Sequence, residues 1–303
     1  MNTTRRSAKL LAVAAASALI FAACGSDDDS SAPEGTDAAE TGDTTETDTT
    51  EGGETETTEG GDMVEGADGG TLIWAHEQEP PDMHLDDPNN NLSITSWIRQ
   101  SIWDGLYGIT ASNEFFPELL AEEAVIAENG DGSVTGSFVL RDGLVWSDGD
   151  DLTADDVKYT FDMIMAADGE DEEGNPNFVY LIGDRTGYDT ITDFTVVSPT
   201  EFTISWSAFF AGWKAMFAEV HPSHIFPADP LEAAALANDV YREWNIDGTV
   251  IPSSGPMIFD SWEVGVQMNL VRNDLYNGSM SPDVSNRGVA HVDGVQINYV
   301  TDT

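Results

Sequence analysis

The boundary near residue 68 constrains this chain more than any other feature of its sequence. Residues 25–68 contain 16 Asp or Glu, no Lys or Arg, and no aromatic residue. Met63 and Val64 are the only large aliphatic side chains in this run, so it cannot bury enough surface to offset the entropy of ordering. We expect an extended, disordered segment whose carboxylates repel one another. A folded core is therefore expected only within residues 69–303.

The N-terminus predicts export and a lipid anchor. Three basic residues within the first nine positions precede Leu10–Ala23, an uncharged run that is short for a membrane span and ends in small residues. Cys24, the only cysteine, follows directly and excludes an intrachain disulfide. The stretch IFAACGS resembles a bacterial lipobox, with Phe21 where Leu is usual. We expect a lipoprotein signal peptide over 1–23, then a lipidated Cys24 and an acidic tether over 24–68. An ordinary signal peptide with an incidental cysteine is the alternative.

The charge of the remaining chain excludes several classes of partner. Residues 69–303 carry 40 acidic against 8 basic residues, a balance of −32. Such a surface offers no basic stripe for phosphates, so we expect no nucleic acid partner. It also opposes adsorption to anionic lipid. The segment is long enough to bury a full core.

Apolar periodicity and turn residues predict a mixed α/β domain with antiparallel pieces. Thr153 is a natural N-cap for the helix that follows it. A hairpin is expected about Asn129–Gly132, and an exposed loop at 168–177. The expected strands are 71–75, 136–141, 194–197, 201–206, 257–262, 266–272 and 292–300, and the expected helices are 94–106, 154–167, 209–220 and 231–244.

The stretch LRDGLVWSDGDDLTADDVKYTF, residues 140–161, carries no nucleophile–base pair and no metal-ligand spacing. In order with GTLIWA, LDDP, SIWDGLYG, FPELLAEE, HPSHIF, SSGPMIFDSW and LVRNDLY, it resembles the bacterial extracellular solute-binding proteins of family 5. These are the peptide-binding components of ABC importers. The resemblance covers about residues 70–303. It implies that the stretch 140–161 belongs to the framework of a first lobe and makes little contact with ligand.

The resemblance implies a periplasmic-binding-protein-like fold of class II, in which ligand lies between two lobes. Family members are longer and build their second lobe after the segment like RNDLY. We therefore expect a partial chain, with lobe I over 69–303, the second lobe missing, and a candidate inserted subdomain at about 113–190. Met257 stands where the family usually has the Tyr of GPY.

The family places first-lobe ligand contacts mainly in the loop after its Leu-Asp-Pro. Asn there offers a donor and an acceptor to a peptide backbone, although Asn also favours loops and caps. The loop residues matched in this way are Asn89, Asn90, Asn91, Leu92 and Ser93. Phe178 and Tyr180 fall where the family has an aromatic contact, with core packing as the alternative. His221 matches a His-Pro of some members. The acidic group that holds the peptide amine would lie in the second lobe.

We expect a non-enzymatic substrate-binding component that captures a peptide or similar small solute and delivers it to an ABC permease by hinge closure. It would be a monomer, anchored by lipid at the outer face of the cytoplasmic membrane or in the periplasmic space. We expect no cofactor and no metal site, because His76, His84, His221 and His224 lack ligand spacing. The alternatives are an exported hydrolase, opposed by the lack of G-x-S-x-G and H-E-x-x-H, and a surface receptor or adhesin that uses the same lobe.

Overall fold

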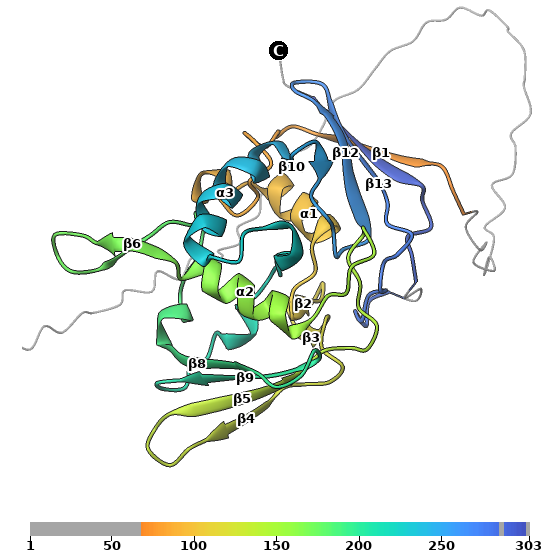
Figure 1. Ribbon diagram of the computed structural model, residues 1–303. Coiled ribbons are helices and arrows are strands. Elements are labelled where there is room, and N and C mark those ends of the chain that lie inside the picture. Colours follow the sequence, from red (N-terminus) through yellow and green to blue (C-terminus); the bar gives the residue numbers. More distant parts are fainter. Residues whose placement is uncertain (1–67, 285–287, 301–303) are drawn as a thin grey trace, which may run out of the picture. The chain divides into compact units, whose positions relative to one another are not determined.

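The first described strand pairs with the last one. A computed structural model describes residues 68–284 and 288–300, all within one unit, Asp62–Thr303 (Figure 1). β1 (Thr71–His76) runs parallel to β14 (Gly294–Tyr299), so segments from opposite ends of the described chain share one sheet. β13 (Gln267–Arg272) and β12 (Met257–Glu263) add antiparallel strands in the order β1-β14-β13-β12. The four strands predicted in these regions are confirmed.

A second four-stranded sheet comes from the middle of the chain. It consists of β4 (Val125–Glu128), β5 (Val134–Val139), β9 (Glu201–Trp206) and β8 (Ile191–Val196), in that spatial order and all antiparallel. The predicted turn about Asn129–Gly132 joins β4 and β5. The candidate subdomain at about 113–190 stays a proposal, and this sheet takes strands from both sides of residue 190.

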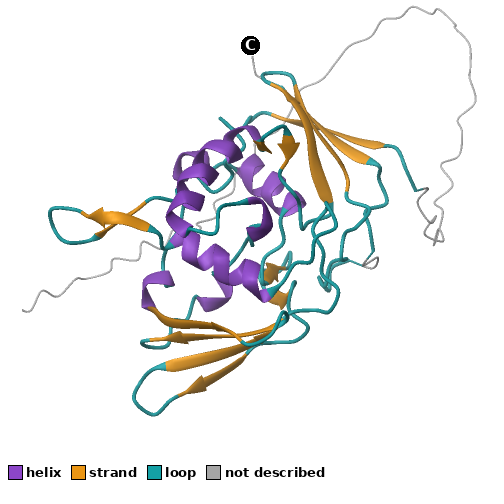
Figure 2. Cartoon of the chain, in the orientation of Figure 1, coloured by secondary structure: helices purple, strands orange, loops and turns teal. Residues whose placement is uncertain are grey.

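Three α-helices carry much of the core: α1 (Ser93–Ile102), α2 (Ala154–Ile164) and α3 (Pro230–Glu243). α1 contacts β12, whereas α2 contacts both β8 and α3, so the helices lie between the two larger sheets (Figure 2). The predicted cap of α2 is confirmed, since the Thr153 side chain accepts a hydrogen bond from the Asp155 amide and Asp156 accepts one from the Thr153 amide. None of the described helices has the length and apolar content needed to cross a membrane.

Two predicted helices end early. α1 stops at Ile102 rather than at residue 106, because Trp103 adopts extended angles (φ −122°, ψ 137°). Gly105, three residues after the end of the helix, packs so closely on the backbone of Phe217 and Ala218 that a Cβ would clash. This contact determines the path of the chain after α1. α2 stops at Ile164 rather than at residue 167.

The expected helix at 209–220 is wrong. Only a short 3-10 turn, η3 (Trp213–Ala215), forms there, and Phe217 adopts a φ of 53° that no α-helix accepts. The exposed loop expected at 168–177 is instead a hairpin of β6 (Ala167–Glu170) and β7 (Pro176–Phe178), with largely exposed side chains. Short elements complete the fold: β2 (Tyr107–Ile109), β3 (Phe115–Pro117), β10 (Asn245–Ile246), β11 (Thr249–Val250), η1 (Pro88–Asn90), η2 (Tyr188–Thr190) and η4 (Ser223–Ile225).

Three expectations about the N-terminal region lie outside the described residues. They are the signal peptide over 1–23, the lipidated Cys24, and the disordered tether up to residue 67. The globular part expected from residue 69 onward is a mixed α/β fold, as predicted.

Candidate functional site

Two neighbouring cavities meet at Arg99 in the last turn of α1. The smaller cavity, of about 500 Å³, lies against the loop before η1 and is called the acidic cavity. The larger one, of about 740 Å³, lies against β2, β3 and the segment after β13, and is called the aromatic cavity. Arg99 and the exposed Ala218 line both of them. A solute that spans the two would therefore pass these two residues.

The acidic cavity has four carboxyl groups and one guanidinium among the described residues that line it. The carboxyls belong to Asp86, Asp87, Asp184 and Glu219, and the guanidinium to Arg99. Asp86 and Glu219 are both buried, with side chains only 1% and 7% exposed. Such burial is costly for a charge, so the partners of these two groups decide their protonation.

A hydrogen-bonded aromatic network holds Asp86 from below. The Tyr180 hydroxyl donates to Asp86 Oδ2 at 2.8 Å, and His221 Nε2 lies 3.5 Å from the same oxygen. His221 Nδ1 in turn lies 2.8 Å from the Tyr241 hydroxyl on α3. All four residues are almost completely buried. The network therefore fixes the Asp86 carboxylate rigidly in the floor of the cavity.

Asp86 and Glu219 differ in the direction in which their pKa values are shifted. Burial by itself would raise the pKa of Asp86, but the neighbouring Glu219 and His221 and the charge of Arg99 outweigh it and hold that pKa below its usual value. Burial raises the pKa of Glu219 well above its usual value, and the charge of Asp86 raises it further. These shifts favour a protonated Glu219 beside a charged Asp86.

Arg99 faces these two acids without a close hydrogen bond to either. Its Nη1 lies 3.6 Å from Glu219 Oε1 and 3.7 Å from Asp86 Oδ1, and its side chain is 31% exposed. Glu219 in its ionised form, and then Asp86, raise the pKa of Arg99. The guanidinium is thus permanently charged, held in place, and partly open to the cavities.

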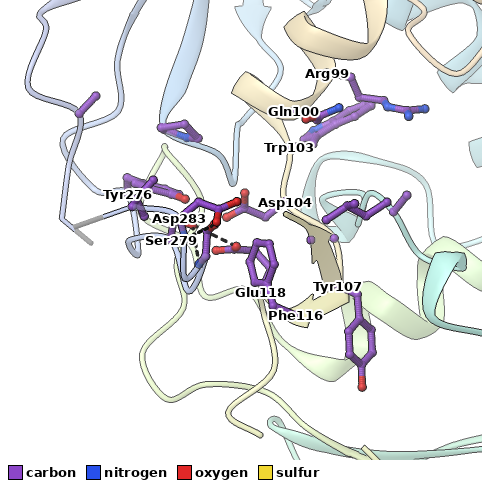
Figure 3. Close-up of a pocket in the computed structure, with 18 of the residues that line it drawn as sticks. Arg99, Gln100, Trp103, Asp104, Tyr107, Phe116, Glu118, Tyr276, Ser279 and Asp283 are labelled. Atoms are coloured by element: carbon purple, nitrogen blue, oxygen red, sulfur yellow. Dashed lines mark hydrogen bonds between the residues drawn. The ribbon is translucent and has the colours of Figure 1, made fainter. Parts of the chain in front are cut away.

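The aromatic cavity combines ring walls with a second carboxyl pair (Figure 3). Its rings come from Trp103, Tyr107, Phe116 and Tyr276. The Ser279 hydroxyl donates to Glu118 at 3.2 Å, and the Met280 amide donates to the same carboxylate at 3.0 Å. Burial raises the pKa of Asp104 well above its usual value, and the charge of Glu118 adds to the rise. Asp104 is accordingly neutral inside a cavity suited to an apolar group.

The predicted loop residues divide between structure and cavity. Asn90 and Asn91 line the acidic cavity. The Asn90 amide nitrogen donates to the carbonyl oxygens of Asp82 and His84, and its oxygen accepts from Thr95, so this side chain is already fully used. Asn91 is exposed and open to a ligand.

The other predicted residues lie outside the lining of both cavities, and their role stays a prediction. Asn89 donates to Asp87, Leu92 is the N-cap of α1, and Ser93 is exposed at its start. The Phe178 ring lies under the Arg185 guanidinium at 4.4 Å. Tyr180 and His221 both contact the Asp86 carboxylate, at 2.8 and 3.5 Å.

Sequence reasoning did not identify Arg99, Asp86 or Glu219. Arg99 has a usable signal, because a basic residue is rare in this chain and stands here within an otherwise uncharged helix. Asp86 lies in the LDDP motif, which by itself predicts only a loop. Glu219 had no signal, since its partners come from distant segments.

The described residues include one group that could offer ligands to a metal ion: Asp148, Asp150 and His224. His224 Nε2 lies 2.9 Å from Asp148 Oδ2 and 3.6 Å from Asp150 Oδ2, at an exposed position outside the lining of both cavities. These contacts are also those of an ordinary surface ion pair. His76, His84 and His221 belong to no such group in the described part of the chain.

Comparisons with known sequences agree on one family. Residues 116–303 match the family of bacterial extracellular solute-binding proteins, family 5 Middle. A probable ABC transporter-binding protein of Deinococcus radiodurans is 30% identical over 176 residues, which cover 55% of this chain and 27% of that protein. The oligopeptide-binding protein OppA of Bacillus subtilis is 25% identical over 190 residues, or 61% of this chain and 33% of that one. This chain thus matches about a third or less of either relative's length.

Solved structures show the same fold. The periplasmic EDTA-binding protein EppA matches with a TM-score of 0.63 at 21% identity, over 78% of this chain and 40% of its own. The oligopeptide-binding protein AppA of Bacillus subtilis, in complex with a nonapeptide, matches with a TM-score of 0.58 at 19% identity, over 77% and 40%. The predicted periplasmic-binding-protein-like fold is confirmed. The chain belongs to the bacterial extracellular solute-binding proteins of family 5.

Proposed function

We propose that this chain is a substrate-binding component of an ABC importer and that its two cavities form one wall of the solute site. The observation that carries the proposal is the meeting of the cavities at Arg99 and Ala218 in a chain of a solute-binding family. The solute would bridge this wall and a second one, and would favour the closed state by binding it more tightly than the open state. No step of chemistry is involved.

A peptide or a similar small solute fits the two kinds of lining. The acidic cavity offers Asn91 and charged groups to polar backbone, and the aromatic cavity offers aromatic side chains such as Phe116 and Tyr276 to an apolar side chain. Sites for small ligands commonly combine apolar walls with a few polar groups that orient the ligand. The relative OppA and the neighbour AppA carry oligopeptide-binding names, which supports the same class of solute here.

A substitution at Ala218 tests the proposal. Because Ala218 is exposed and borders both cavities, Ala218→Trp should occlude them at little cost to the fold. Calorimetric titration of a mixed pentapeptide library into the full chain should give saturable binding that this variant abolishes. The control is Ala127→Trp, at an exposed position on β4 outside both linings, which should bind like the parent.

Equal binding by the parent and Ala218→Trp would contradict the cavity wall. Mass spectrometry of the same library should recover every peptide intact, whereas cleavage products would favour the exported hydrolase. Peptide binding without co-purification of an ABC permease from the native membrane would favour a surface receptor.

We propose that the chain is exported as a monomer and is held at the outer face of the membrane through Cys24. The support is the position of the sole cysteine directly behind a signal-like run. Metabolic labelling with an alkynyl fatty acid should label the parent and not Cys24→Ser. Label that survives this substitution would contradict the anchor and leave an ordinary exported protein.

A further inference from the structure

We infer that Arg99 anchors a carboxylate, or a planar anion of similar shape, on the solute. The inference deepens the proposed function and rests on it, because it names the class of solute that the wall selects. It begins from a contrast between Arg99 and the other basic side chains of the described residues.

Every other described Lys or Arg is engaged by a close acceptor. Arg141 donates to two carbonyl oxygens at 3.0 and 2.9 Å, and Arg185 donates to two more at 3.1 and 2.6 Å. Four more are paired with carboxylates: Lys158 with Asp162, Lys214 with Glu123, Arg242 with Asp82 and Asp87, and Arg272 with Asp274 and Asp293. Arg99 alone has its nearest carboxylate oxygens at 3.6 and 3.7 Å.

The position of Arg99 directs these donors to a ligand. It lines both cavities, and its side chain is 31% exposed. A guanidinium presents a planar fork of donors that matches a carboxylate through two parallel hydrogen bonds. The nearest acid oxygens lie 3.6 and 3.7 Å from Nη1, so the donors of the fork are not taken up by a close hydrogen bond.

The charges around Arg99 leave room for an anion. Asp86 Oδ2 is hydrogen-bonded by Tyr180, whereas its Oδ1 lies 3.7 Å from Arg99 Nη1, beyond a close hydrogen bond. With Glu219 protonated, as its raised pKa favours, the Asp86–Glu219–Arg99 group is neutral. Asp87 is paired with Arg242 at 3.2 Å, and Asp184 accepts from the Thr186 amide at 2.8 Å. A ligand carboxylate would therefore meet the Arg99 guanidinium, whose nearest carboxylate oxygens lie 3.6 and 3.7 Å away.

The same arrangement predicts a dependence on pH. Two charged groups lie beside Glu219: Asp86 from the loop before η1 and Arg99 from α1. His221 lies beside Asp86. The other titratable groups that interact with Glu219 are Tyr188 from η2, Tyr180 from the segment after β7 and Tyr241 from α3. When rising pH removes the Glu219 proton, a second negative charge appears beside Arg99. The affinity for an anion should then fall, and the affinity for a neutral analogue should not.

The probes that test this are N-acetyl-pentaalanine as the free acid and as its C-terminal amide, titrated into the full chain. The parent should bind the acid about tenfold or more tightly than the amide. Arg99→Gln should remove that preference. Arg272→Gln, which removes a guanidinium outside both cavities, should keep it. Glu219→Gln should keep the preference and lose its decline at high pH.

A direct readout is the Arg99 Nε–Hε resonance in a ¹⁵N spectrum, assigned through Arg99→Lys. It should move saturably with the acid and much less with the amide. Equal affinity for acid and amide, or an Arg99 resonance that does not move, would overturn the inference. If acid and amide bind with equal affinity and Ala218→Trp abolishes that binding, the inference about Arg99 is wrong but the proposed function stands. An acid-specific shift that persists in Ala218→Trp would support the anchor and contradict the wall.

Discussion

The protein buries two carboxyl pairs, each beside one arginine, and they differ in what the arginine does. Asp86 and Glu219 face Arg99, which is partly exposed and has its closest carboxylate oxygens at 3.6 and 3.7 Å. Asp104 and Glu118 lie near Arg141, whose charge opposes the rise in the pKa of Asp104. Arg141 donates to the carbonyl oxygens of Asn277 and Gly278 at 3.0 and 2.9 Å.

The comparison separates an arginine that stabilises the fold, Arg141, from one that is available to a ligand, Arg99. Arg141 joins the end of β5 to the loop after β13, and thus ties the second sheet to a segment of the first. Both bonds come from Nη1, and the Nε and Nη2 donors of Arg141 are buried without a hydrogen-bond partner among the described residues, out of reach of a solute. Arg99 joins no such segments through a hydrogen bond, and the cavity side of its guanidinium stays open.

The largest expected effect separates the two arginines by stability. Arg141→Met should lower the free energy of unfolding by about 3–5 kcal/mol, because it leaves two carbonyls and a buried acid pair without their cation. Arg99→Met should cost about 1–2 kcal/mol, since its contacts are longer and solvent screens them. Urea unfolding followed by tryptophan fluorescence measures both. Losses of equal size would mean that Arg99 is as structural as Arg141.

Features that depend on neighbouring residues could be predicted from the sequence. The cap of α2 needs only Thr153 and Asp156, which are three residues apart, and the β12–β13 hairpin needs one turn. The helix predicted at 209–220 does not form, although its apolar residues follow a helical period. Contacts with residues distant in the sequence determine its backbone conformation instead. The Phe217 amide donates to the Tyr188 hydroxyl at 2.7 Å, and Gly105 approaches the Phe217 carbonyl.

The candidate site was harder to predict for the same reason. Asn90 and Asn91, which line the acidic cavity, can be proposed from the motif that they follow. The group that decides the charge of the cavity instead joins Asp86, Arg99 and Glu219 from three separate segments. No local pattern indicates that Glu219 is neutral. That property arises only when the fold buries it against another carboxyl.

The two aspartates of these pairs should respond to pH in opposite directions. The pKa of Asp86 is lowered in the folded protein, so its contribution to stability is present above the ordinary pKa of an unfolded Asp and is lost as pH falls through the folded value. Asp86→Asn should therefore lose about 1–3 kcal/mol at neutral pH, where it gives up charge-assisted hydrogen bonds. The loss should shrink in acid. A constant loss at every pH would contradict a charged Asp86.

The smallest effect belongs to Asp104, and its sign is reversed. Because the pKa of Asp104 is raised, the folded protein binds a proton that the unfolded chain releases, and stability falls as pH rises from the ordinary value towards the raised one. Asparagine has nearly the same shape as a protonated aspartate and cannot ionise, so Asp104→Asn should remain within about 1 kcal/mol of the parent at neutral pH. Its unfolding free energy should also decline less with rising pH. Urea unfolding at a series of pH values measures both slopes under one set of conditions. A steeper decline in Asp104→Asn than in the parent would mean that Asp104 is charged in the fold and that the two acid pairs are built alike.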